Sequence, residues 1–337
     1  MERHCHDIAT ARSVLAQDEI CTNSTLWLDR VAPALLADTR PLVHVSCGTN
    51  KGYGVLSMLR RFANVSVTPR SWWLALSQYR KEARVRGSRK RGVTCGHCGG
   101  CEDDGSVALA ARELAVHAIE LLPDNVRWLR WAFAHFGLRV ALTHAAVGNA
   151  SGRVMTPNFG LGVGYEMARA GGASGHVGRM LRLDDYLEEE EVRHVHVLSM
   201  DLESWDGLAL RGLTGSFAAR RVSIVEFEAK RQGWGAETAR QARLAAASGE
   251  LRLDQTVRWL GSFGYGCFFQ TKSGCVVPVS GACWQDAFGP PTCGGNGLCA
   301  VGTPLTLLWN LSDECARCSV EQMTALRGGV ARSGVCV

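Results

Sequence analysis

Short apolar runs alternate with amphipathic segments through most of the chain. Short apolar runs bounded by turn residues predict strands, and apolar residues at helical spacing predict helices. The pattern predicts strands at 42–47, 114–119, 140–147, 195–200, 222–227, 266–270 and 305–309. It predicts helices at 55–62, 123–137, 181–187 and 253–263. Strands alternating with helices indicate an α/β fold, with a mostly parallel sheet, right-handed crossovers and helices on both faces.

The same pattern divides the chain into three parts. Residues 1–40 are expected to form a helical lead-in that ends at Pro41, and residues 41–312 the main α/β domain. Residues 313–337 form a cysteine-containing tail. The first predicted helix and the second strand are separated by far more chain than a single crossover needs, so residues 63–112 are expected to be an insertion.

Composition places the chain among ordinary globular proteins, because 46% of its residues are apolar and 20% are charged. No apolar run approaches the roughly 20 residues that a membrane helix needs, and the N-terminus lacks an apolar signal segment. We therefore expect a soluble protein without a membrane span. Its compartment is left open between the cytoplasm and the lumen of the secretory pathway.

Cysteines and glycosylation sequons favour the lumen. The chain has 14 cysteines, and four of its eight asparagines stand in Asn-x-Ser/Thr sequons, namely Asn23, Asn64, Asn149 and Asn310. Cys95, Cys98 and Cys101 have the spacing of a zinc knuckle, which Cys315 and Cys318 could complete. A structural zinc is expected if the compartment is reducing, and disulfides are expected if it is oxidising.

Basic residues are concentrated in one segment. The net charge is +5, and residues 80–91 carry seven Lys or Arg residues against Glu82 alone. Such a run could contact a phosphate backbone, but a solvated insertion is the simpler interpretation. No aromatic residue stands between Lys81 and Arg91, so nucleic acid is not favoured as a partner.

Candidate chemistry gathers where the predicted strands end. Ligands of parallel α/β sheets bind at the carboxyl ends of the strands. The first strand runs into a glycine loop that begins at Cys47 and ends at Gly54, the second strand ends at Glu120, and later strands end at Asp201 and Glu228. Glycines let a backbone approach a ligand closely, and a carboxylate after the second strand can accept the ribose hydroxyls of a nucleoside. The sequence therefore predicts a nucleoside site.

Five blocks in order resemble the FkbM-type methyltransferase family over about residues 42–270. The first is Ser46 to Gly52, which resembles Asp-Val-Gly-Ala-Asn-x-Gly. The second is Val116-His117-Ala118-Ile119-Glu120 with Pro123 to Asn125. The third to fifth are Ala146 to Gly152, Leu183 to Leu187 and Ser199 to Asp206. The chain departs from the family at Ser46, where the family has aspartate, and at Ser204, where it has glycine.

The resemblance implies a class I, Rossmann-like methyltransferase that uses S-adenosylmethionine. It further implies O-methylation of a sugar, another glycan or a hydroxylated small molecule. The cofactor would contact Ser46, Gly48, Asn50, Gly52, Glu120, Ala146, Val147 and Asp201, and the base would be Asp201, Glu203 or Glu228. A helix-capping role for Glu203 and an interior hydrogen-bonded role for Glu228 stay open. An NAD-dependent oxidoreductase and a catalytically silent binding protein are the alternatives, although the loop lacks Gly-x-Gly-x-x-Gly spacing.

Overall fold

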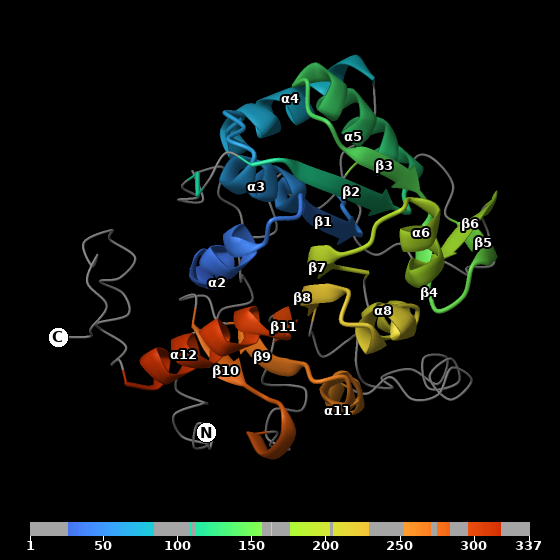
Figure 1. Cartoon of the computed structure of the whole chain (residues 1–337). Coiled ribbons are helices and arrows are strands. Elements are labelled where there is room, and N and C mark those ends of the chain that lie inside the picture. The colour runs from blue at the N-terminus through green and yellow to red at the C-terminus, as the bar shows by residue number, and fades with distance from the viewer. Residues whose placement is uncertain are drawn as a thin grey trace. The chain divides into compact units, whose positions relative to one another are not determined.

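The computed structural model describes residues 26–83, 108–109, 112–156, 163, 176–202, 205–228, 253–270, 275–283 and 296–317. Its contacts divide the chain into two compact units (Figure 1). One comprises Thr39–Val222, and the other combines Met1–Asp38 with Ser223–Val337. Both contain helices and strands, so the predicted α/β class is confirmed.

A parallel sheet forms the centre of the Thr39–Val222 unit. Its strands are β1 (Leu42–Cys47), β2 (Leu114–Glu120), β3 (Ala141–His144) and β7 (Val195–Met200). They lie in the order β7-β1-β2-β3, and β1 pairs with both β2 and β7. Along the chain, β2 and β3 are placed on one side of β1, and β7 is placed on its other side. A topological switch point therefore lies between β1 and β7, at the position where such sheets bind ligands.

Helices cover both faces of this sheet. Apolar side chains of α3 (Tyr53–Phe62), α4 (Pro69–Glu82) and α5 (Pro123–His135) pack with Val116 and Ala118 of β2. His117 lies between these two residues and therefore points to the opposite face. There its Nδ1 lies 3.1 Å from the hydroxyl of Tyr186, on α6 (Leu183–Glu189).

Helix α4 lies inside the segment predicted as an insertion, and it is part of the core. It begins with a capping box at Thr68 and Ser71 and has Pro69 in its first turn, a favourable start for a helix. Trp72 is fully buried and packs edge-on against Trp128 of α5. This half of the predicted insertion therefore belongs to the same hydrophobic core as α3 and α5.

The predicted strand at 140–147 is wrong as a single element. It splits at Ala145 into β3 and β4 (Ala146–Gly148), and β4 pairs with β6 (His176–Arg182) in a small sheet of order β4-β6-β5. The third strand is β5 (Gly152–Thr156). The apolar pattern is continuous across Ala145, so hydrophobicity alone could not show the change of sheet.

Two short helices follow β7, α7 (Asp206–Arg211) and α8 (Thr214–Ala218). Asp184 of α6 accepts hydrogen bonds from the backbone N–H groups of Gly215 and Ser216, at 2.8 and 3.0 Å, and thereby stabilises the start of α8. The Leu183 to Leu187 block of the family resemblance thus has a structural role here.

The other unit contains an antiparallel sheet of order β10-β9-β11-β8. Its elements are α2 (Leu26–Ala37), β8 (Val222–Glu228), α11 (Leu253–Ser262), β9 (Gly266–Gln270), β10 (Val276–Pro278), the 3-10 turn Gly281–Cys283, β11 (Asn296–Ala300) and α12 (Thr303–Arg317). The expectation of parallel strands therefore holds in the first unit only. The predicted strand at 305–309 is wrong, because Leu305, Leu308 and Trp309 are buried at helical spacing within α12.

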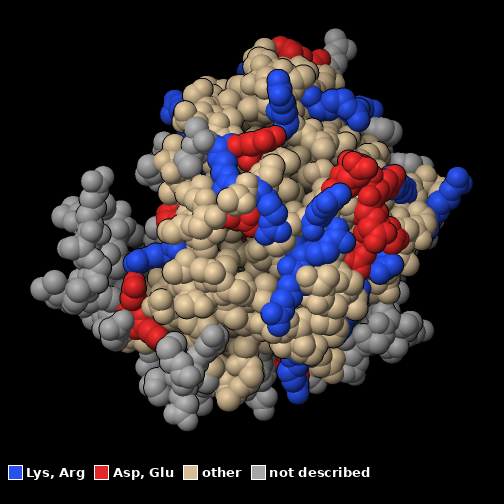
Figure 2. Space-filling view, in the orientation of Figure 1, with Lys and Arg blue, Asp and Glu red and all other residues tan. Residues whose placement is uncertain are grey.

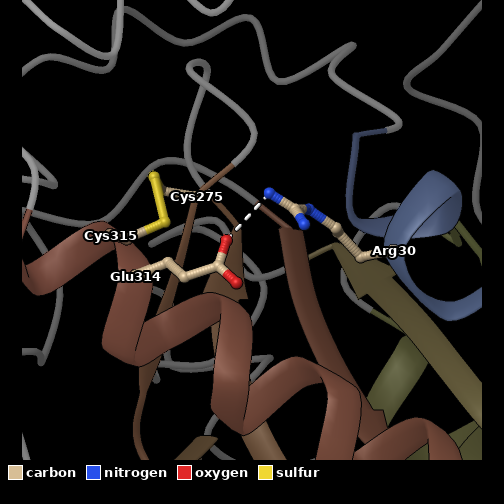
Figure 3. The surroundings of a disulfide bond; sticks show 4 residues. All are labelled: Arg30, Cys275, Glu314 and Cys315. Atoms are coloured by element: carbon tan, nitrogen blue, oxygen red, sulfur yellow. Dashed lines mark hydrogen bonds and ion pairs between the residues drawn. A yellow bond between two sulfur atoms is a disulfide. The ribbon is translucent and has the colours of Figure 1, made fainter. Parts of the chain in front are cut away.

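Two disulfides between described residues and one ion pair link elements of this unit. Cys267 and Cys299 are register partners on β9 and β11 and are bonded to each other. Cys275 is bonded to Cys315 of α12, beside the ion pair between Arg30 of α2 and Glu314, whose nitrogen and oxygen lie 2.8 Å apart (Figure 3).

Among the residues described, no helix combines the length and the apolar character that crossing a membrane requires.

Candidate active site

The glycine loop after β1 is held in a conformation that requires glycine. Gly48 and Gly52 have φ angles of 76° and 90°, and Asn50 between them has 51°. A Cβ atom on Gly48 would lie 1.9 Å from the carbonyl oxygen of Asp201. The loop therefore lies directly against the end of β7, at the switch point of the sheet.

Glu120 ties the end of β2 to this loop. Its Oε2 accepts a hydrogen bond from the backbone N–H of Asn50 at 2.6 Å, and its Oε1 accepts one from the N–H of Leu122 at 2.8 Å and one from Nδ2 of Asn125 at 3.3 Å. Only 4% of Glu120 is exposed. Burial raises the pKa of its carboxyl above the ordinary value, although these hydrogen bonds partly oppose the change.

Two tryptophans fix the middle of the loop. The indole nitrogens of Trp72 on α4 and Trp128 on α5 both donate to the carbonyl oxygen of Lys51, at 2.8 and 3.0 Å. Neither tryptophan is among the site residues predicted from the sequence. The only sequence signal was the presence of tryptophans in amphipathic segments, which is more often a sign of a core helix.

Asp201 is the exposed carboxylate of this edge. Its backbone N–H donates to the carbonyl oxygen of Cys47 at 3.0 Å, so its main chain continues the pairing of β1 with β7 while its side chain is exposed. The next N–H, of Leu202, lies 3.4 Å from the carboxylate of the buried Asp206, which begins α7. Asp206 thus stabilises the turn, and Asp201 remains accessible.

Two buried polar atoms of the loop region have no hydrogen-bond partner among the residues described: Oδ1 of Asn50 and the hydroxyl of Tyr53. Tyr53 begins α3, and burial raises the pKa of its phenol. A buried polar atom without a partner costs about 1–3 kcal/mol. A ligand that donates to Asn50 or bonds to Tyr53 would recover that energy, so the loop has unused capacity for polar contacts.

The remaining predicted cofactor residues lie close to this loop. The hydroxyl of Thr49 bonds to the carbonyl oxygen of Ser46 at 3.1 Å, where the resembled family has an aspartate. The N–H of Ala145 donates to the carbonyl oxygen of Glu120 at 3.0 Å, which places the buried Ala146 and Val147 just beyond the end of β2. The structure therefore gathers Ser46, Gly48, Asn50, Gly52, Glu120 and Asp201 at one edge of the sheet, with Ala146 and Val147 next to Glu120.

The other two predicted acids lie outside the described residues of the Thr39–Val222 unit. Glu203 lies outside the described residues. Glu228 ends β8 in the other unit, where it is buried and pairs in register with Asn296 of β11. Of the three predicted candidates for the base, Asp201 is the one that the described residues place at the loop.

The predicted zinc ligands receive one correction. The sulfur of Cys315 is bonded to Cys275 and is therefore not available to a metal. Cys95, Cys98, Cys101 and Cys318 lie outside the described residues. The sequence left a structural zinc and disulfides open for the cysteines, and Cys315 forms a disulfide.

Charge on the face drawn in Figure 2 is mixed, with blue and red side chains interspersed among uncharged ones. Most of the basic run at 80–91 lies outside the described residues. Arg80, which is described, donates to the carbonyl oxygen of Val163 at 2.7 Å, and burial lowers the pKa of its guanidinium. This arginine therefore has a structural contact.

Comparisons with known proteins add little. No protein-family model and no curated protein matches the chain. Among solved structures, the chain is similar to the crystal structure of methyltransferase FkbM from Methylobacillus flagellatus, at 9% sequence identity and a TM-score of 0.35. The match covers 87% of this chain and 58% of that chain, so this chain spans less than two thirds of that protein.

Proposed function

We propose that the Thr39–Val222 unit binds S-adenosylmethionine at the loop between β1 and α3 and is a methyltransferase. The observation that carries this proposal is the convergence of three features at the switch point: the left-handed loop at Gly48 to Gly52, the carboxylate of Glu120 on the loop N–H, and the exposed Asp201. The free atoms of Asn50 and Tyr53 fit a cofactor with an amino group and ribose hydroxyls, since these groups donate hydrogen bonds.

Each residue has a distinct role in this proposal. Glu120 is a positioning residue, because its oxygens already hold Asn50 and Leu122, and it has little acceptor capacity left for a ribose hydroxyl. Asp201 is proposed as the base, since the bound cofactor supplies an electrophilic methyl group and an acceptor hydroxyl must lose a proton. The acceptor class proposed is a sugar, another glycan or a hydroxylated small molecule.

The spacing of the loop glycines weighs against an NAD-dependent oxidoreductase. The loop has glycines at 48, 52 and 54, which is not the Gly-x-Gly-x-x-Gly spacing of dinucleotide sites.

Ligand-induced stabilisation tests the proposal. At a concentration about 100 times its Kd, a ligand stabilises the folded state by about 2.7 kcal/mol. We expect S-adenosylhomocysteine to raise the melting temperature of the full chain and NAD to leave it unchanged. Stabilisation by NAD alone would refute the proposal.

Methyl transfer is tested separately with labelled methyl donor and fractionated cell extracts. Asp201→Asn is expected to remove label transfer and to leave the melting temperature of the unliganded protein unchanged, because the side chain is exposed. Glu188→Gln, an exposed acid on α6, is the matched control and should leave both unchanged. Stabilisation without any transfer by the unaltered protein would identify a silent binding protein.

A further inference from the structure

Two of the four sequons place their asparagine side chains at exposed positions of surface loops. Asn64 lies between α3 and α4, and Asn149 lies between β4 and β5. Both asparagines are exposed, and so are the serines that complete their sequons, Ser66 and Ser151. A glycan is bulky and hydrophilic, so it can be carried only at such positions of a folded protein.

The presence of Asn64 has an alternative structural explanation, which accounts for only part of the sequon. Asn64 follows the C-cap of α3 and has a φ of 52°, a position where helices favour glycine or asparagine. That role uses the backbone and leaves the side-chain amide exposed. It also gives no reason for a serine two positions later.

The cysteines supply an independent observation about the compartment. Of the six cysteines in the described residues, Cys267, Cys275, Cys283, Cys299 and Cys315 are disulfide-bonded, and Cys47 is a buried free thiol. Disulfides of this kind persist in oxidising compartments and are rare in the cytosol. In eukaryotic cells the lumen of the secretory pathway both oxidises thiols and glycosylates asparagine.

We infer that Asn64 and Asn149 are N-glycosylation sites and that the protein matures in the oxidising lumen of the secretory pathway. The substrate is a lipid-linked oligosaccharide diphosphate. Nδ2 of the asparagine forms a bond to the anomeric carbon, the bond from that carbon to the lipid diphosphate oxygen breaks, and the amide loses one proton. The leaving group is the lipid diphosphate, and no atom changes oxidation state.

Peptide mapping of protein isolated from its natural cells tests the inference directly. Release of the glycans by an amidase in heavy-oxygen water converts each occupied asparagine to a labelled aspartate. We expect labelled aspartate at positions 64 and 149. Unmodified asparagine at both positions would overturn the inference.

Variants of the full chain, expressed in the same cells, connect the glycans to these residues. Ser66→Ala removes one sequon and Ser66→Thr retains it, and both changes are at an exposed side chain. Asn149→Gln is used at the second site, because Ser151 also donates to Asp185 at 2.7 Å and its replacement would disturb that contact. We expect Ser66→Ala and Asn149→Gln each to remove one glycosidase-sensitive step in gel mobility, and Ser66→Thr to keep it. A mobility shift that persists unchanged in the double variant Ser66→Ala, Asn149→Gln would also overturn the inference.

Discussion

Replacing Gly48 by alanine tests whether the glycine loop packs against the end of β7. A second glycine-to-alanine variant controls for the general effect of adding a methyl group. Gly48 has a φ of 76°, a conformation that costs a non-glycine residue about 1–2 kcal/mol. The new Cβ would also lie 1.9 Å from the carbonyl oxygen of Asp201. Because that oxygen belongs to the backbone, β7 or the loop must move, and overpacking of this kind costs about 1–3 kcal/mol.

The expected loss in the free energy of unfolding is therefore about 2–5 kcal/mol. Urea unfolding followed by tryptophan fluorescence measures it, since Trp72 and Trp128 contact the same loop. The matched control is Gly54→Ala. Gly54 lies in the first turn of α3 with no atom within 4 Å of its Cβ position, so alanine should stabilise the helix by about 0.5–1 kcal/mol.

The two variants are expected to change the free energy of unfolding in opposite directions. Gly48→Ala should also lose stabilisation by S-adenosylhomocysteine, whereas Gly54→Ala should keep it. If Gly48→Ala unfolds within about 0.5 kcal/mol of the unaltered protein, a range usual for surface substitutions, then the loop does not lie against Asp201 as described.

Three further predictions concern the core and the disulfides. Trp72→Phe should lower the free energy of unfolding by about 1 kcal/mol, because Trp128 still donates to the same carbonyl, whereas Trp72→Ala should cost about 3–5 kcal/mol in urea titrations. Burial lowers the pKa of His44 to about 4 from an ordinary 6.5. The free energy of unfolding is therefore at its full value above pH 6.5 and should fall by about 3 kcal/mol as the pH drops to 4, because the unfolded chain binds the proton more readily. His44→Phe should flatten the curve of stability against pH over that range. Loss of Cys275–Cys315, which spans 40 positions, should cost about 4 kcal/mol, and an unchanged urea midpoint in the double variant Cys275→Ser, Cys315→Ser would contradict this.

Strands of the first unit could be predicted closely because they are short, apolar and bounded by turns. β1 and β7 have the predicted bounds, and β2 extends the prediction by one residue, Glu120. The error at β3 has a physical cause, since the chain changes sheet at Ala145 without any change in polarity. At α12, burial of one helix face produced an apolar cluster that resembles a strand over five residues.

The candidate site could be predicted in position but not in its contacts. Glycines before a helix and an acid after the second strand indicated that residues near 50 and 120 meet, and the 2.6 Å bond from Asn50 to Glu120 is consistent with that. The support from Trp72 could not be predicted, because it comes from a helix inside a segment that spacing alone marked as an insertion. Tertiary contacts of this kind leave no periodic trace in the sequence.

Cys47 offers an internal reporter at the base of the glycine loop. It is the free thiol among the described cysteines, it is 1% exposed, and burial raises its pKa, so it should resist alkylation in the native state. A thiol reagent can reach it only when the end of β1 opens. The rate of its labelling therefore measures how often this edge of the sheet opens, and a molecule bound at the loop should slow that rate.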